Sequence, residues 1–249
     1  MQLLALPGFL AFFFASLWVG VRLLAQGRRN HGLPEILLGL GVLCIGPIGF
    51  GLSLLAAAAA AGNPEAPSIW AGLSALAVGC GAATKSIFNW RIYHPRSRAV
   101  AAISILAIVL LAVAIVADGL TTGFAPAGWM RPGWILVRQA VQVAVLFWGA
   151  SEAISWWRRM QRRARLGIGD AVVANRFLLW GIGAGMAGAG SLVGTVVGLS
   201  LGQPLGELPA LTLTLSCFGM TSACALWLAF APPEAYVRWL RANGSPSES

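Results

Sequence analysis

The stretch AVAAISILAIVLLAVAIVA, residues 99–117, contains a single hydroxyl group and no charged side chain. A helix that crosses a bilayer needs about 20 mostly apolar residues, because the hydrocarbon core is roughly 30 Å thick. A strand of a membrane barrel would alternate apolar and polar residues, and this stretch does not alternate. It therefore predicts a transmembrane α-helix.

Six further stretches of the same kind lie on either side of it. They are predicted at about residues 2–24, 36–61, 68–90, 134–157, 177–200 and 209–231. The whole chain is 58% hydrophobic and 10% charged, whereas a typical soluble domain has about 25% charged residues. We predict an all-α polytopic membrane protein: a seven-transmembrane helix bundle over residues 1–231 and a short cytoplasmic tail over residues 232–249.

The net charge of +9 is distributed unevenly between the loops. Fifteen of the 17 Lys and Arg residues flank the first, third and fifth loops or lie in the tail, and only Arg131 and Arg138 fall on the other side. Basic residues in short loops stay in the cytoplasm, so we predict the N-terminus outside and the C-terminus inside. The basic surplus then serves topology and attracts anionic lipid, at about 1 kcal/mol per residue, and we expect no nucleic-acid partner.

Two ionisable residues of opposite charge lie within predicted spans. Lys85 comes six residues before Arg91, and Glu152 comes six residues before Arg158. At about 1.5 Å rise per residue, the two side chains would lie at a similar depth in the inner half of the bilayer. Ionisable groups are costly there and face a partner or a cavity, so we predict a Lys85–Glu152 ion pair.

Polar residues also repeat at helical spacing on the third and fifth predicted spans. Such a face should turn away from lipid, and we predict a polar pocket between these two spans. The alternative is a structural cross-brace near the inner rim. The pocket would be formed by Ser74, Lys85, Asn89, Arg138, Gln142 and Glu152.

Small residues and one proline mark two further helices. Gly190, Gly194 and Gly198 form a small-xxx-small ridge on the sixth span, which allows close helix contact. Pro47, between Gly46 and Gly49, is predicted to kink the second span. Such a kink is either a hinge beside a cavity or simply tolerated packing.

Several enzyme and cofactor classes are disfavoured by the residue inventory. Both histidines, His31 and His94, lie in predicted loops, so no span offers imidazole to a haem or a catalytic metal. The sequence HExxH does not occur, and a Ser–His dyad within the bilayer is not available. The one lysine, Lys85, lies on the third span, whereas a retinal linkage would require the last. We predict a non-enzymatic protein without catalytic residues, metal or cofactor.

The fifth loop, residues 158–176, is the most distinctive predicted soluble element. It follows two tryptophans and begins RRMQRRAR, and Asp170 or Asn175 is suited to cap the next helix. Its arginines either act only as a topology determinant or form a docking surface for an acidic partner or anionic lipid. The docking residues would be Arg158, Arg159, Arg162, Arg163 and Arg165.

Three stretches resemble a group of uncharacterised bacterial seven-span integral membrane proteins. They are GLPEILLG at residues 32–39, WRIYHP at residues 90–95 and GDAVVANRFLLWG at residues 169–181. The resemblance covers most of the chain and implies a multi-pass protein of the bacterial inner membrane. It implies no activity and no functional residues.

Three functions fit these features. The first is a receptor-like sensor that responds to a lipophilic or small ligand and relays to a cytoplasmic partner. The second is a small-solute or lipid transporter, although the sequence has no convincing inverted repeat. The third is a structural or accessory subunit of a membrane complex. The sparse polar face and the elaborate basic rim favour the sensor.

Overall fold

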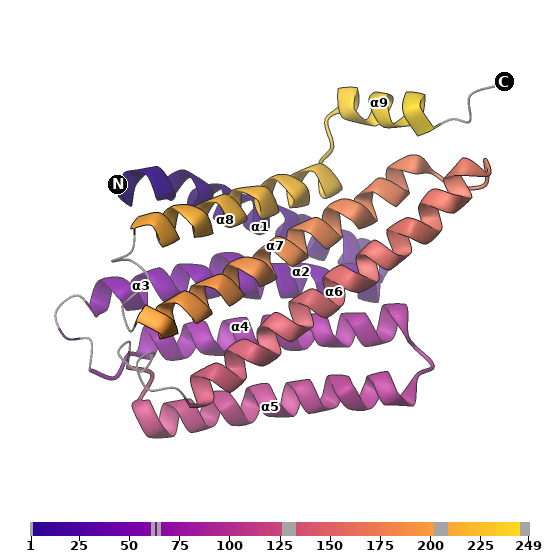
Figure 1. Cartoon of the computed structure of the whole chain (residues 1–249). Coiled ribbons are helices and arrows are strands. Elements are labelled where there is room, and N and C mark those ends of the chain that lie inside the picture. The colour runs from indigo at the N-terminus through magenta and orange to yellow at the C-terminus, as the bar shows by residue number, and fades with distance from the viewer. Residues whose placement is uncertain (1, 61–62, 64–65, 126–132, 202–208, 245–249) are drawn as a thin grey trace.

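The computed structural model describes residues 2–60, 63, 66–125, 133–201 and 209–244, and the regular structure of these residues is entirely helical (Figure 1). The elements in chain order are α1 (Gln2–Asn30), α2 (Leu33–Leu43), η1 (Cys44–Phe50), α3 (Gly51–Ala59), α4 (Ile69–Phe88), η2 (Asn89–Tyr93), α5 (Arg98–Thr122), α6 (Trp134–Arg165), α7 (Ala171–Leu201), α8 (Pro209–Phe230) and α9 (Glu234–Gly244). Both η segments are π-helical.

Seven helical segments of the described chain are long and apolar enough to cross a membrane, which confirms the predicted number of spans. The second segment consists of α2, η1 and α3, and the third consists of α4 and η2. Many large apolar side chains remain exposed on the outside of the bundle, as at Phe14 and Val116, which are 60% and 61% exposed. Such exposure suits a protein whose solvent is lipid.

One end of the bundle collects the turns after α1, η2 and α6 together with the end of α8, on the right of Figure 1. We call it the basic end, because the described arginines of these turns and of α9 lie there. The antiparallel arrangement places the starts of α4, α6 and α8 at the opposite end (Figure 1). The basic residues are therefore segregated along the bundle axis as the sequence indicates.

Helix ends at the basic end follow local sequence signals. The Ser97 hydroxyl accepts a hydrogen bond from the Val100 amide and caps α5. The Asp170 carboxylate accepts one from the Val172 amide at 2.8 Å, so the predicted cap of the sixth span is confirmed at this residue. Between them, α6 ends just before Gly167, whose φ of +73° places it in the left-handed region that favours glycine.

The predicted loop at residues 158–176 is wrong in its extent. Helix α6 continues to Arg165 and α7 starts at Ala171, so only five residues separate the two helices. The run RRMQRRAR consists mostly of strong helix formers, and arginines near a helix C-terminus interact favourably with its dipole. The arginines of this run lie on the last turns of α6, not in a loop.

The second span changes its hydrogen-bonding pattern around Pro47, which lies in the middle of η1. Proline has no amide proton and its ring crowds the carbonyl four residues earlier, which favours a local π-helical turn. Ser74 of α4 stabilises this turn, because its hydroxyl donates to the Gly49 carbonyl at 2.7 Å. At Pro47, where the sequence predicts a kink, the structure has a π-helical segment that α4 contacts through Ser74.

Helix α7 packs between α6 and α8. A side chain at Gly181 would lie 2.8 Å from Ile154 of α6, so this glycine sets the close approach of the two helices. Gly190 faces Phe218 of α8, Gly194 is buried, and Gly198 is half-buried. Glycine ridges on α7 therefore face both neighbours.

Candidate functional site

Lys85, the only lysine of the chain, lies in the interior of the bundle on α4. Its side chain is only 6% exposed. Its ammonium nitrogen lies 4.5 Å from the centre of the Trp180 ring of α7. A cation over an indole face is attracted by the ring quadrupole, and the attraction is strongest where both groups are desolvated.

A cavity of about 40 Å³ adjoins this pair. Its lining comes from α1, α2 with η1, α4, α6, α7 and α8, so every spanning segment except α5 contributes to it. One water needs about 10–15 Å³ of such space, so the cavity has room for a very small ligand. Its polar lining side chains are Ser16, Lys85 and Ser222, and the remaining lining residues are apolar or glycine.

The two hydroxyls beside the cavity are bonded to main-chain carbonyls. Ser16 donates to the Phe12 carbonyl within α1. Ser222 of α8 donates to the Gly183 carbonyl of α7 at 2.9 Å. These bonds fix the walls of the cavity and join α8 to α7 at its edge.

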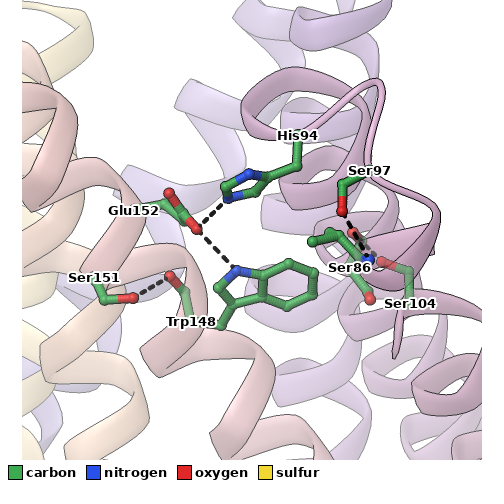
Figure 2. A network of polar contacts seen from close by, with 8 residues as sticks. Ser86, His94, Ser97, Ser104, Trp148, Ser151 and Glu152 are labelled. Atoms are coloured by element: carbon green, nitrogen blue, oxygen red, sulfur yellow. Dashed lines mark hydrogen bonds and ion pairs between the residues drawn. The ribbon is translucent and has the colours of Figure 1, made fainter. Parts of the chain in front are cut away.

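Glu152 of α6 forms a second polar site, close to the basic end. Figure 2 shows its carboxylate between two nitrogen-bearing rings. One oxygen lies 2.6 Å from Nε2 of His94 and accepts a hydrogen bond from the Trp148 indole at 3.2 Å. His94 follows η2, so this contact joins the turn between η2 and α5 to α6.

The predicted Lys85–Glu152 ion pair is therefore wrong. Each residue has another partner: Trp180 for Lys85 and His94 for Glu152. The depth comparison failed because Arg158 does not mark the end of α6, which continues to Arg165. Glu152 lies at the level of His94. His94 follows Lys85 by nine residues, which corresponds to a separation of about 13 Å along a helix axis.

The remaining members of the predicted pocket are distributed along the bundle. Asn89 is buried, and its side-chain oxygen would lie 3.3 Å from a side chain at Gly149, so it packs against α6 one turn before Glu152. Its side-chain nitrogen has no hydrogen-bond partner among the residues that the structure describes. Ser74 bonds to Gly49, and Gln142 is half-buried on α6. The structure therefore contains separate polar sites in place of the one predicted pocket.

A third polar site lies near the opposite end of the bundle. Arg138 of α6 lies 3.6 Å from the carboxylate of Asp118 on α5, and both side chains are largely buried. The Thr122 hydroxyl donates to the same carboxylate at 2.9 Å. The sequence interpretation missed Asp118 because it ended the fourth span at residue 117. Its position could have predicted the pair. Asp118 lies four residues before the end of α5, and Arg138 lies four residues after the start of α6, so both are near the same end of the bundle.

An aromatic row connects α4, η2, α6 and α7 at the basic end. Phe88 contacts Tyr93 edge to face, Tyr93 lies beside Trp156, and Trp156 stacks on Phe177. Centroid separations of 5.6–6.1 Å are within the range of favourable aromatic pairs. Arg159 lies over the Trp156 ring at 5.5 Å, which joins the arginine-rich end of α6 to this row.

Comparisons with known proteins identify no relative. The chain matches no protein-family model, no curated protein and no solved structure.

The α7 helix also contacts the C-terminal segment at the basic end. The Asn175 side-chain amide donates to the Tyr236 hydroxyl of α9 at 2.8 Å. The cavity, the Glu152–His94 contact and α9 are thus joined through α4, η2, α6 and α7.

Proposed function

We propose that this protein is a receptor-like sensor of the bacterial inner membrane, with its N-terminus outside and its C-terminus inside. A small ligand binds in the cavity beside Lys85, and the response is relayed to a cytoplasmic partner without catalysis. The proposal rests chiefly on Lys85, a buried lysine without a carboxylate partner among the described residues, which lines a cavity contacted by six of the seven spans. A ligand at that point contacts nearly every helix whose packing could change.

The relay would start at the π-helical segments beside the cavity. Ile45 and Gly46 of η1 line the cavity, and η2 begins four residues after Lys85. Single π-helical turns within α-helices occur frequently at functional sites. A shift of α4 on ligand binding would therefore displace η2, which follows α4 directly.

From η2 the change would reach α6 through two contacts, Tyr93 on Trp156 and His94 on Glu152. The last turns of α6 carry the arginines predicted to dock a partner, and Arg159 already lies over Trp156. An acidic surface of a cytoplasmic partner, or anionic lipid, is the chemistry that this cluster would recognise. Movement of Trp156 would alter the presentation of these arginines.

Affinity purification from native membranes tests the proposal. Wild-type protein should retain a stoichiometric partner whose yield changes in Lys85→Met and in Glu152→Gln, because these variants affect the cavity and the relay. Glu234→Gln is a suitable control, since its ion pair with Arg238 is exposed and 4.0 Å long. A partner retained equally by all variants would instead indicate an accessory subunit of a complex.

Transport is a second candidate, favoured by the polar atoms along α4 and α6. Within the described residues, buried polar atoms without a hydrogen-bond partner occur on Ser86, Asn89, Arg138 and Gln139. Such groups are commonly satisfied by water or a solute. Solute-dependent flux into vesicles that contain only this protein would favour transport and contradict the sensor.

A further inference from the structure

The ammonium group of Lys85 lies in the bundle interior without a carboxylate partner among the described residues. Asp118 and Glu152 are paired with Arg138 and His94, and no salt bridge is formed by Lys85. The ring of Trp180 offers only a quadrupole, which compensates less charge than an anion does. A buried charge without a counter-charge is costly in a membrane, so the site as built favours an added negative charge.

The size of the cavity that Lys85 and Trp180 line determines how large that charge can be. The cavity measures about 40 Å³, which is comparable to a few water molecules. Two of its walls are made by glycines, Gly41 of α2 and Gly183 of α7. A side chain at Gly41 would lie 3.3 Å from the aliphatic part of Lys85, so this glycine leaves room for the lysine itself.

We infer that the cavity binds a small monovalent anion. The Lys85 ammonium group would donate to it, while the hydroxyls of Ser16 and Ser222 keep their bonds to the main-chain carbonyls of Phe12 and Gly183. The shared chemistry is one negative charge on a group of a few atoms, and this fits a halide or nitrate as well as the carboxylate of the smallest organic acids. The inference rests on the proposed function, since it names the class of ligand that the sensor would detect.

A titration of purified protein in nanodiscs of neutral lipid tests this inference. The buffer contains gluconate, which is too large for the cavity, and chloride, nitrate or formate is added at constant ionic strength. A ligand that binds only the folded state raises the unfolding temperature logarithmically with its concentration. We expect such a logarithmic rise, followed by intrinsic tryptophan fluorescence. The order of the three anions distinguishes a halide from a carboxylate ligand.

Two variants test whether the response comes from this cavity. Lys85→Met should abolish it or weaken the apparent affinity by about tenfold or more, because a hydrogen bond to a charged group is worth at least that factor. Gly183→Ala adds one methyl group in ordinary contact with Leu226, at 3.5 Å, and should weaken nitrate and formate more than chloride. It also keeps the test decisive if Lys85→Met does not fold.

Gly185→Ala is the matched control. It lies two residues away on α7, does not line the cavity, and its added methyl group would make an ordinary contact of 3.6 Å with Ala150. Its titration should equal that of the wild type. Equal responses to all anions, gluconate included, or an unchanged response in both Lys85→Met and Gly183→Ala, would overturn the anion assignment.

The partner measurement separates this inference from the sensor proposal. Partner retention that depends on Lys85 without any anion response would overturn the anion and leave the sensor standing. A specific anion response that leaves partner retention unchanged in the wild type would support the anion site and overturn the sensor. Loss of both the anion response and the partner retention in Lys85→Met would support the two proposals.

Discussion

Replacement of Asp118 should destabilise the protein strongly, because it leaves the buried Arg138 without a counter-charge. The side chains of Asp118 and Arg138 are 3% and 13% exposed. Removal of one partner of a buried pair costs about 3–5 kcal/mol. The nitrogen–oxygen distance is 3.6 Å, whereas an ideal charge-assisted hydrogen bond measures about 2.7–2.9 Å. We therefore expect the loss of unfolding free energy to be near the lower limit, about 3 kcal/mol.

For a chain of this length 1 kcal/mol corresponds to about 2–4 °C in unfolding temperature, so Asp118→Asn should lower it by roughly 6–12 °C. Asparagine keeps the shape and can still accept from Thr122, which isolates the charge. The double variant Asp118→Leu with Arg138→Met should recover most of the loss, since an apolar pair of similar volume is often neutral.

Thermal unfolding in nanodiscs, followed by tryptophan fluorescence, provides the measurement. Glu234→Gln serves as the control, because exposed ion pairs contribute only about 0–1 kcal/mol. A fall of less than about 2 °C for Asp118→Asn, or no recovery in the double variant, would refute the view that this pair is a buried brace.

Three further predictions concern packing, topology and the basic end. Gly181→Ala should lower the unfolding temperature because the new methyl group would approach Ile154 to 2.8 Å, whereas Gly185→Ala should be neutral; equal effects would contradict the packing account. Reporter fusions after Asn30 should report cytoplasm and fusions after Asn63 periplasm, and a reversed pair would invert the proposed orientation. Replacement of four arginines by Gln should weaken binding to anionic liposomes at low salt, where screening is least. Unchanged binding would mean that these arginines serve topology alone. The four are Arg158, Arg159, Arg162 and Arg163.

The sequence was sufficient to predict the helices but not the direction of their side chains. Seven apolar stretches and their basic flanks indicate spans because length and composition alone decide whether a helix can cross a bilayer. The depth of Glu152 was misjudged because the end of α6 was placed at Arg158, and helix-forming arginines continue it to Arg165. Asp118 was missed for the related reason that α5 extends to Thr122.

The candidate site depends on tertiary contacts that no local pattern contains. Lys85 was singled out from its position in a span, yet its contact with Trp180 joins residues 95 positions apart. Only the rotation of α4 and α7 about their axes places these side chains together. The π-helical segments are likewise weakly encoded: Pro47 indicates one of them, and the residues of η2 contain neither proline nor glycine.

Coupling between the Lys85 cavity and the basic end can be measured by hydrogen exchange at residues 89–97, because this segment joins the cavity to the Glu152–His94 contact. Exchange is measured in nanodiscs in chloride and in gluconate, for wild-type protein and for Lys85→Met. We expect chloride to change the protection of this segment in the wild type and to leave it unchanged in the variant. The same protection in both salts for the wild type, or an equal change in the variant, would contradict a ligand-responsive cavity coupled to the basic end.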